Sequence, residues 1–512
     1  MPLSEDEKLV WLGLKETVSD DTFSGSTPPT NSNDEELTTD DGSPLAGIRV
    51  HPEPGQTYDG VDVPAGTTEV FGARVEFSEQ TPVVESEQPP DTEPVSDPPV
   101  DGEPGGDGTG KGDPAAQGIE FSTTLDAVED LGMDNTGSTP INDQLAGAVA
   151  DGTLIEFPAG AYQIDPDGGG VAVNGVTNFG MVGLGQTRTD TKFQLPQGTA
   201  GRSFTFGSGA SKTYLANCVM DQSTDPGTNI EVVVNQNGKH YQYNTAHIGK
   251  TAPNQDTYPG GEDSSAIVVS MGPGANCHLE NYQKTDPLTR LVDYPENQIS
   301  IQSPRGHEGS LDVVNAFMAK SGEHSLYCSR PAGAVRVTGG LFKNNINTNM
   351  RICGEGSYIK DATILVDMDP AQAIEDDTGD PQAVRGVWWE AGSYGYSGGY
   401  IENCEIIYTS QTGSCPGVIR IEGSAGAMEV RDTTIRNETS HTTVFVERIG
   451  EGLGGATPPK PWDITFKNVT FEGAGSAPPV VNVGDRTVTL EDCTIDMPNA
   501  AQPRGVEVVN SG

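Results

Sequence analysis

The feature that most constrains this chain is a short phrase that returns from about residue 214 to residue 495. In each copy a run of strand-forming residues is followed by Asn or Asp, then by a small residue, then by another strand-forming run. The bend residues expected from these copies are Asn217, Asn315, Asn344, Asp361, Asn403, Asp432, Asn468 and Asp492. A repeat of this kind is typical of a solenoid, in which each coil buries the core of the next.

The residue types within the phrase favour strands. Val, Ile and Phe suit a pleated strand with one buried face, and Asn and Asp tolerate the left-handed backbone of a sharp bend. Stacked coils would align the bend residues into a ladder and leave space inside for small residues only, here Cys218, Ala316, Ala362, Cys404 and Cys493. A helical solenoid competes, but no window keeps an apolar period of about 3.6 for long. The sequence therefore predicts an all-β fold, a right-handed parallel β-helix over residues 118–512.

The charge of the chain limits its partners. It has 74 acidic against 29 basic residues and a formal net charge of −45. Nucleic acid is not expected as a partner, because binding it needs a basic surface. The acidic residues are spread along the chain, which favours a halophilic protein, since molar salt shortens the Debye length to about 3 Å and screens self-repulsion. An ordinary acidic protein is the alternative.

Metal and membrane sites have little support in the sequence. The seven cysteines form no CxxC or Cys/His cluster with zinc spacing, so no metal site of that kind and no cofactor is predicted. Asp367, Asp369 and the run 375–377 fit a solvated acidic loop or a turn that holds a structural cation. No apolar run approaches about 18 residues, so no membrane span is expected. The acidic start, without a recognisable leader, predicts synthesis and folding in the cytoplasm.

Four segments precede the β-helix. Residues 1–18 are predicted to form a short helix, because Ser4 and Glu7 make a capping box before the apolar run 9–14. It would act as an anchoring or oligomerisation peptide, with a frayed tail as the alternative. Residues 19–44 and 88–117 are expected to be acidic linkers. Between them, residues 45–87 form a small β element with strands near 47–51 and 68–77.

The opening of the body resembles a known superfamily. Residues 125–134, 140–149 and the phrase Phe157-Pro158-Ala159-Gly160-Ala161-Tyr162 are similar to the start of the pectate-lyase-like β-helices, which include polysaccharide lyases, glycosidases and viral tailspikes. The resemblance implies a short amphipathic helix over the open end of the solenoid. The resemblance identifies no functional site. The sequence motifs of the polygalacturonases are missing, and residues 306–309 match one of them only in part.

The chemically densest stretch is residues 305–390. Residues one coil apart stack on a β-helix face, so His324, Arg351 and Arg385 are expected to approach one another. Aromatic planes beside Arg and Glu suit a sugar site, because rings stack on apolar sugar faces and charged groups bind hydroxyls or uronates. The predicted glycan-binding residues are Trp388, Trp389, His324, Tyr327, Arg330, Arg351 and Arg385.

Two alternatives stay open at this stretch. In an alternating strand one of two adjacent tryptophans points inward, so a structural role for either is the competing interpretation. A hydrolase needs two carboxyl groups about 5 to 10 Å apart across the scissile bond. The candidates for that pair are Glu323 and Glu390.

Two functions from different classes follow. The first is a spike, fibre or decoration protein on the surface of a virus of halophilic archaea, which binds glycan or glycoprotein on the host surface. Its N-terminal segment would contact other virion proteins, and closed symmetry would favour a homo-oligomer. The alternative is a haloarchaeal polysaccharide lyase or glycosidase, secreted or at the cell surface, that acts on acidic polysaccharide. A spike that also cleaves glycan combines the two.

Overall fold

The computed structural model divides the chain into two compact units, Met1–Ser96 and Asp97–Gly512. In the first unit it describes residues 7–13, 49–50, 57–58, 61–62 and 70–76. In the second it describes residues 110–509, with gaps at 167–169, 197–198, 200, 208, 224–229, 250–263, 286–297, 369–383, 411–414 and 416. The described residues contain no helix that is long and apolar enough to cross a membrane.

The first unit contains short strands. Strand β1 (Glu7–Gly13) pairs antiparallel with β5 (Val70–Glu76) and parallel with β2 (Arg49–Val50), and β3 (Thr57–Tyr58) pairs with β4 (Val61–Asp62). Strands β2 and β5 lie within the two segments predicted as strands. Residues 7–13, predicted as part of a helix, form β1 instead. An isolated short helix is marginal, whereas pairing with β5 along all seven residues satisfies the backbone of a run rich in strand formers.

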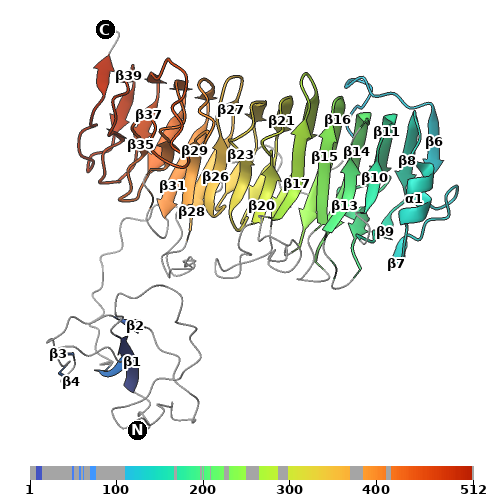
Figure 1. Cartoon of the computed structure of the whole chain (residues 1–512), viewed down its shortest axis with the longest axis horizontal. Helices are drawn as coiled ribbons and strands as arrows, with labels where there is room; N and C mark the ends of the chain where they lie inside the picture. Colours follow the sequence, from blue (N-terminus) through green and yellow to red (C-terminus); the bar gives the residue numbers. More distant parts are fainter. Residues whose placement is uncertain are drawn as a thin grey trace. The chain divides into compact units, whose positions relative to one another are not determined.

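The second unit is a parallel β-helix, as predicted. Figure 1 shows its coils stacked from β6 and α1 at the cyan end to β39 at the red end. A typical coil has three strands, which fall on three faces. The third face is one sheet of β10 (Val171–Val173), β13 (Gly201–Phe206), β15 (Ile230–Gln236), β17 (Ser264–Met271), β20 (Gln298–Gln302), β23 (His324–Cys328), β26 (Asn347–Ile352), β29 (Val384–Trp389), β32 (Ile419–Ile421), β35 (Val444–Val446) and β38 (Val480–Asn482).

The first and second faces meet at the bend within each coil. The first face contains β6 (Thr123–Asp126), β8 (Thr153–Phe157), β11 (Thr177–Gly183), the first halves of β14 (Ser211–Asp221) and β16 (Lys239–Ile248), β18 (Asn276–Glu280), β21 (Ser310–Val314), β24 (Ala334–Thr338), β27 (Tyr358–Lys360), β30 (Tyr400–Glu402), β33 (Met428–Arg431), β36 (Ile464–Lys467), β39 (Val488–Glu491) and β41 (Glu507–Val509). The second face contains β7 (Thr136–Pro140), β9 (Gly160–Gln163), β12 (Thr191–Gln194), the second halves of β14 and β16, β19 (Gln283–Thr285), β22 (Phe317–Ala319), β25 (Leu341–Lys343), β28 (Thr363–Asp367), β31 (Glu405–Ser410), β34 (Thr434–Asn437), β37 (Thr470–Glu472) and β40 (Thr494–Asp496).

The bend residues adopt the left-handed conformation that the repeat predicted. Their φ angles lie between 50° and 55° at Asn217, Asn244, Asn281, Asn315, Asp361, Asn403, Asp432, Asn468 and Asp492. Neighbouring side chains bond in pairs, as where the Asn403 amide donates to the Asp361 carboxylate at 2.7 Å. Asn344 is also left-handed, with φ 53°, but it follows β25 at the end of the second face, whereas Gly339 occupies the bend between β24 and β25 with φ +67°. Glycine turns there without strain, so the phrase was assigned to the wrong corner.

The small residues after the bends line the core. Cys218, Ala316, Ala362 and Cys404 are buried, and Cys493 is partly buried against the same core. All lie in a hydrophobic core of Val, Ile, Leu and Phe that runs through the coils. Burial raises the pKa of the Cys404 thiol to about 12, so it stays protonated and acts as a small apolar group.

The N-terminal end of the solenoid is capped as the resemblance implied. Helix α1 (Asn142–Ala148) buries Leu145 and Ala148, and a 3-10 turn, η1 (Arg188–Asp190), follows in the next coil. The Phe157 and Tyr162 rings pack edge to face at 5.0 Å. A side chain at Gly160 would lie 2.5 Å from the Asn135 backbone oxygen, so the turn needs glycine.

The last residues of the predicted second linker lie against the first face. The Asn244 amide donates to the Gly110 backbone oxygen at 3.3 Å, and the Lys239 ammonium donates to Gln117 Oε1 at 3.2 Å. The Tyr214 hydroxyl donates to the Lys111 backbone oxygen. The β-helix unit therefore includes residues 110–117, ahead of the predicted boundary at residue 118.

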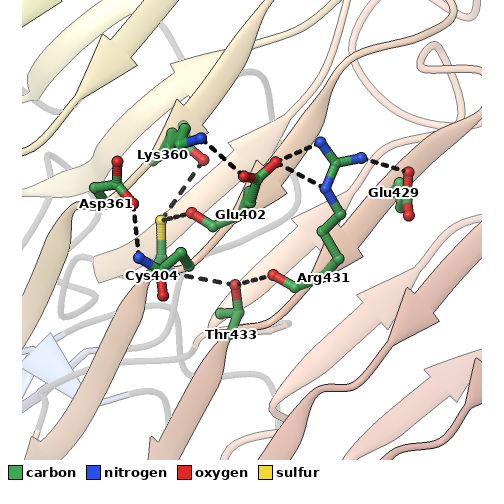
Figure 2. Close-up of polar contacts among 9 residues, drawn as sticks. Lys360, Asp361, Glu402, Cys404, Glu429, Arg431 and Thr433 are labelled. Atoms are coloured by element: carbon green, nitrogen blue, oxygen red, sulfur yellow. Dashed lines mark hydrogen bonds and ion pairs between the residues drawn. The ribbon is translucent and has the colours of Figure 1, made fainter.

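On the outside of the first face, charges are paired with their opposites. Glu402 bonds both Lys360, at 2.9 Å, and Arg431, and Arg431 also bonds Glu429 at 2.9 Å (Figure 2). Arg431 lies 4.3 Å from the centre of the Tyr400 ring, which stacks on Tyr358 at 5.2 Å. We call these six residues the matched ladder, because each charged member has an opposite charge within bonding distance.

Candidate functional site

The outer side of the third face carries a different column of residues. Tyr327, Arg351, Trp388 and Arg420 stand in register on β23, β26, β29 and β32. Side chains alternate along a strand, so these four point outward while the next residues point into the core. His324 and Arg385 lie at the start of β23 and β29, and Arg330 follows β23. We call these seven residues, Tyr327, Arg351, Trp388, Arg420, His324, Arg385 and Arg330, the arginine–aromatic cluster.

Guanidinium groups surround the aromatic rings of this cluster. The Trp388 ring centre lies 4.2 Å from the Arg351 guanidinium carbon and 4.6 Å from those of Arg385 and Arg420. The Tyr327 ring centre lies 4.3 Å from Arg351 and 4.9 Å from Arg330. Such contacts hold cations in place and are strongest where water is excluded. Trp388 and Tyr327 are only 5% and 8% exposed, so the rings order the arginines in a dry setting.

Carboxylates bind some of these arginines. Arg351 Nε lies 2.6 Å from Glu390 Oε1, which also accepts a hydrogen bond from the Ser329 hydroxyl. Arg420 lies 2.6 Å from Glu447. Arg385 instead donates to the Asn347 side chain at 2.8 Å. Within the described residues, the charges of Arg385 and Arg330 therefore have no carboxylate partner.

Buried polar atoms without a partner gather at this cluster. Among the described residues they include Arg351 Nη2, Arg385 Nε, Trp388 Nε1, Glu390 Oε2, His324 Nδ1, Glu323 Oε2 and Glu422 Oε2. A buried polar group that lacks a hydrogen bond costs about 1–3 kcal/mol, more if charged. A concentration of such groups on the outer side of one sheet is what a site for a polar ligand requires.

Burial shifts the titration of several groups at the site. Burial, helped by the charge of Glu390, raises the pKa of Glu422 to about 7. Burial also lowers the pKa of His324, and the nearby Arg351 lowers it further against the opposing effect of Glu323. For Glu323, burial raises the pKa, but His324 and Arg351 outweigh it and the net direction is down. Near neutral pH the site thus combines an ionised Glu323, a neutral His324 and a partly protonated Glu422.

The structure brings most of the predicted glycan-binding residues together. The Nε2 atom of His324 lies 3.2 Å from Arg351 Nη1, and the His324 and Tyr327 ring centres are 5.0 Å apart. Trp389 points inward and is 0% exposed, so it packs the core and does not face a ligand. Trp388 faces outward, but its ring contacts arginines and is not open for stacking on a sugar.

The two predicted catalytic carboxylates are joined through other side chains. Glu323 Oε1 lies 3.2 Å from His324 Nε2, and Arg351 connects His324 to Glu390. Both carboxylates therefore have cationic or polar partners, as they would in a binding site. Their assignment as a catalytic pair stays a prediction.

Sequence reasoning missed one member of the cluster, Arg420, and two of its neighbours, Glu422 and Glu447. A signal was present, because the segments 387–390, 419–422 and 444–447 each place Glu after a strand and stack in register. The strands are short and ordinary, so only knowledge of the coil register would have aligned them.

The described residues contain no group of three His, Cys, Asp or Glu side chains placed to hold a metal ion. Asp367 bonds Lys343 at 3.0 Å and the Asn344 amide at 2.7 Å. Asp369 and the run 375–377, the other residues considered for a cation, lie outside the described residues.

Comparisons with known proteins give similar folds. No family model and no curated protein matches the chain. Solved structures with a similar fold include ORF18 of Geobacillus virus E2 (10% identity, TM-score 0.37, 73% of this chain), the A-module of the mannuronan C-5 epimerase AlgE4 of Azotobacter vinelandii (12%, 0.41, 76%) and a mannuronic acid-specific family 6 polysaccharide lyase from human gut microbiota (8%, 0.44, 76%). The chain spans 62% of the viral protein, 100% of the epimerase module and 83% of the lyase. Similarity at this level carries no argument about function.

Proposed function

We propose that this protein binds an acidic glycan through the arginine–aromatic cluster. The observation that carries the proposal is the set of buried, unpartnered guanidinium nitrogens on the outer side of the third face, Arg351 Nη2 and Arg385 Nε. In a chain with a net charge of −45, Arg330 and Arg385 of this cluster lie over aromatic rings and have no carboxylate partner among the described residues. A negatively charged ligand would satisfy both the charge and the hydrogen bonds.

The chemistry of the cluster fits a carboxylated or sulfated sugar. Guanidinium groups match carboxylate and sulfate oxygens in pairs of parallel hydrogen bonds. The Trp388 ring fixes three arginines in advance, which reduces the entropy lost when a ligand binds. The neutral His324 adds a ring nitrogen that can bond a sugar hydroxyl.

For the biological role we propose a surface spike, fibre or decoration protein of a virus that infects halophilic archaea. The β-helix would bind glycan or glycoprotein of the host surface, and the N-terminal unit would attach it to other virion proteins as a homo-oligomer. The order of a small β unit, acidic linkers and a β-helix supports this role. The acidic composition supports a high-salt setting, where surface repulsion is screened.

A second candidate is a polysaccharide lyase or glycosidase acting on acidic polysaccharide. The specific observation in its favour is Glu422, whose pKa burial and the neighbouring Glu390 raise to about 7. A carboxyl group that keeps its proton near neutral pH beside a second carboxylate is the arrangement that general acid catalysis of glycoside cleavage uses. Under this alternative Glu422, with Glu390 or Glu323, would carry the reaction.

The test is a binding and cleavage assay in molar KCl. Polygalacturonate, alginate and heparin serve as acidic probes and dextran as a neutral one. Retention of the protein, new reducing ends and unsaturated products are followed together. We expect retention on at least one acidic probe, none on dextran, and a loss of retention in Arg385→Gln.

Arg431→Gln on the matched ladder is the control variant, because it removes an arginine whose charge is already paired. Equal retention of the wild type on dextran and on the acidic probes would contradict the proposal. Cleavage products that disappear in Glu422→Gln would establish the enzyme in place of the binding protein.

A further inference from the structure

A loop beside the cluster carries an exposed aromatic ring. Residues 391–399, between β29 and β30, contain Tyr394, which is 40% exposed. Its ring stacks on Tyr396 with centres 6.1 Å apart and planes 7° apart. Tyr394 therefore presents part of its ring to solvent, where a sugar can contact it, whereas Trp388 is only 5% exposed.

This loop is continuous with the cluster through named contacts. The Tyr396 hydroxyl donates to the Arg330 backbone oxygen at 3.3 Å. Arg330 lies over Tyr327, and Tyr327 lies under Arg351. Arg305 lies 5.4 Å from the centre of the Tyr394 ring. Arginine and aromatic side chains thus succeed one another from the exposed Arg305 to the buried Trp388.

In the described residues, the two arginines nearest the loop are not paired with a carboxylate. Within the described residues, the Arg305 and Arg330 guanidinium groups have no carboxylate or hydrogen-bond partner, and each lies over a tyrosine ring. Arg336, Arg420, Arg431, Arg436 and Arg448, in contrast, are each paired with an acidic residue. The charges of Arg305 and Arg330 are therefore available to an anionic group beside the exposed part of the Tyr394 ring.

Gly392 of this loop lies next to the buried Glu390 carboxylate, with room for one added carbon atom. A methyl group added at Gly392 would lie 3.4 Å from Glu390 Oε2 and 3.6 Å from Arg330 Nε. Both are ordinary contact distances, so the position can accept an atom. Glu390 Oε2 is one of the buried atoms without a partner among the described residues. A ligand hydroxyl that reached this space would bond it.

We propose that Tyr394, Arg305 and Arg330 form an outer subsite that binds one negatively charged sugar unit, with its apolar face on Tyr394 and its anionic group between the arginines. The adjoining unit of the chain would then reach the space at Gly392 and the buried cluster. This inference rests on the proposed glycan binding and specifies where the ligand chain leaves the cluster. The anionic group is a carboxylate or a sulfate, which the probes below distinguish.

The experiment is titration calorimetry of the full chain in molar KCl with oligogalacturonate, heparin-derived and maltose-series oligosaccharides of matched length. We expect Tyr394→Ala to weaken binding of the acidic probe about tenfold, in line with the loss of a stacking contact. Arg305→Gln should weaken it about three- to tenfold and reduce its salt dependence. Tyr358→Ala, in the stacked pair of the matched ladder, is the control and should leave binding unchanged.

Gly392→Ala tests the space directly, because it keeps every charge and fills the position next to Glu390. Gly132→Ala controls for backbone strain, since Gly132 also has a positive φ, +64°, and open surroundings. Weaker binding in Gly392→Ala with unchanged binding in Gly132→Ala supports the subsite.

The outcomes separate the subsite from the function. Acidic probes bound with full affinity by Tyr394→Ala and Arg305→Gln would overturn the subsite and leave the proposed function standing. No binding of any acidic probe by the wild type would overturn both. Binding of the maltose-series probe as tight as that of the acidic probes, and equally sensitive to Tyr394→Ala, would overturn the anionic assignment.

Discussion

The matched ladder on the first face and the arginine–aromatic cluster on the third both combine arginines, carboxylates and aromatic rings. They differ in how completely the arginine charges are paired. In the ladder, Arg431 is bonded to both Glu402 and Glu429 (Figure 2). It also lies over the Tyr400 ring. In the cluster, three arginines surround Trp388, and Arg385 has no carboxylate partner among the described residues. The Arg431 side chain is 31% exposed and that of Arg351 is 4%.

This difference in charge pairing distinguishes a structural set of residues from a candidate binding site on the same β-helix. Exposed charges that are paired stabilise little and need no ligand. Buried charges that are incompletely paired cost stability, and such a cost is typical of functional sites. We infer that the charges of the ladder are satisfied without a ligand and that the cluster serves binding. The predictions below test this division, starting from the largest expected effect.

The Arg351→Gln variant should lose about 3–5 kcal/mol of unfolding free energy, because Glu390 would be left as an unpaired buried charge. Arg431→Gln should lose less than about 1 kcal/mol, because its carboxylate partners remain in contact with water. Denaturant unfolding of both variants in molar KCl measures the two losses. Similar losses at the two sites would remove the distinction between cluster and ladder.

Glu422→Gln should change how stability depends on pH. The folded protein keeps the Glu422 proton up to a pKa of about 7, whereas the unfolded chain releases it near 4.5. Stability therefore falls as pH rises between these values, and a neutral Gln should remove about 2–3 kcal/mol of that fall. Thermal unfolding at a series of pH values gives the profile. Glu429→Gln on the ladder is the control, and a wild-type slope retained in Glu422→Gln would refute the assignment.

Substitutions at the bend residues between the first and second faces should change stability through backbone strain and not through charge. Asn403 has φ 51° and donates to Asp361. Asn403→Ala should cost about 1–2 kcal/mol, because alanine is disfavoured in the left-handed region. Asn403→Gly should cost less, since glycine adopts this φ freely. If the two variants unfold at the same temperature, the hydrogen bond and not the backbone holds the bend.

The smallest effect is expected for the Lys360–Glu402 pair of the ladder. The Lys360 side chain is 38% exposed, so its pairing is screened by salt. A double-mutant cycle between Lys360→Met and Glu402→Gln should show no measurable coupling in molar KCl. The corresponding cycle between Arg351 and Glu390 should keep its coupling there. Strong coupling at Lys360 in molar salt would contradict the screened character of the ladder.

The fold was predictable because the residue types at the bends indicate a left-handed backbone conformation. Asn and Asp followed by a small residue indicate a left-handed bend before a buried position, and eight such copies sufficed to predict a parallel β-helix. Asn344 was misplaced because Gly339 makes the same bend without any side-chain signal. Strand β1 was missed because the β5 residues that pair with it lie some sixty residues further on.

The site was predictable in part. Stacking of residues one coil apart correctly placed His324, Arg351 and Arg385 together, since strand register follows from the repeat. It did not predict which of the two tryptophans faces outward, because that depends on which alternate residues of β29 point into the core. The ring contacts of Trp388 were also beyond prediction, because they depend on Arg420, one coil further along.

A crystal structure of the protein with a bound acidic oligosaccharide tests the division between cluster and ladder most directly. We predict an anionic group of the sugar within hydrogen-bonding distance of Arg351 Nη2 or Arg385 Nε, with the matched ladder unoccupied. An oligosaccharide seated over Tyr358 and Tyr400 instead, with only water beside those guanidinium nitrogens, would contradict it.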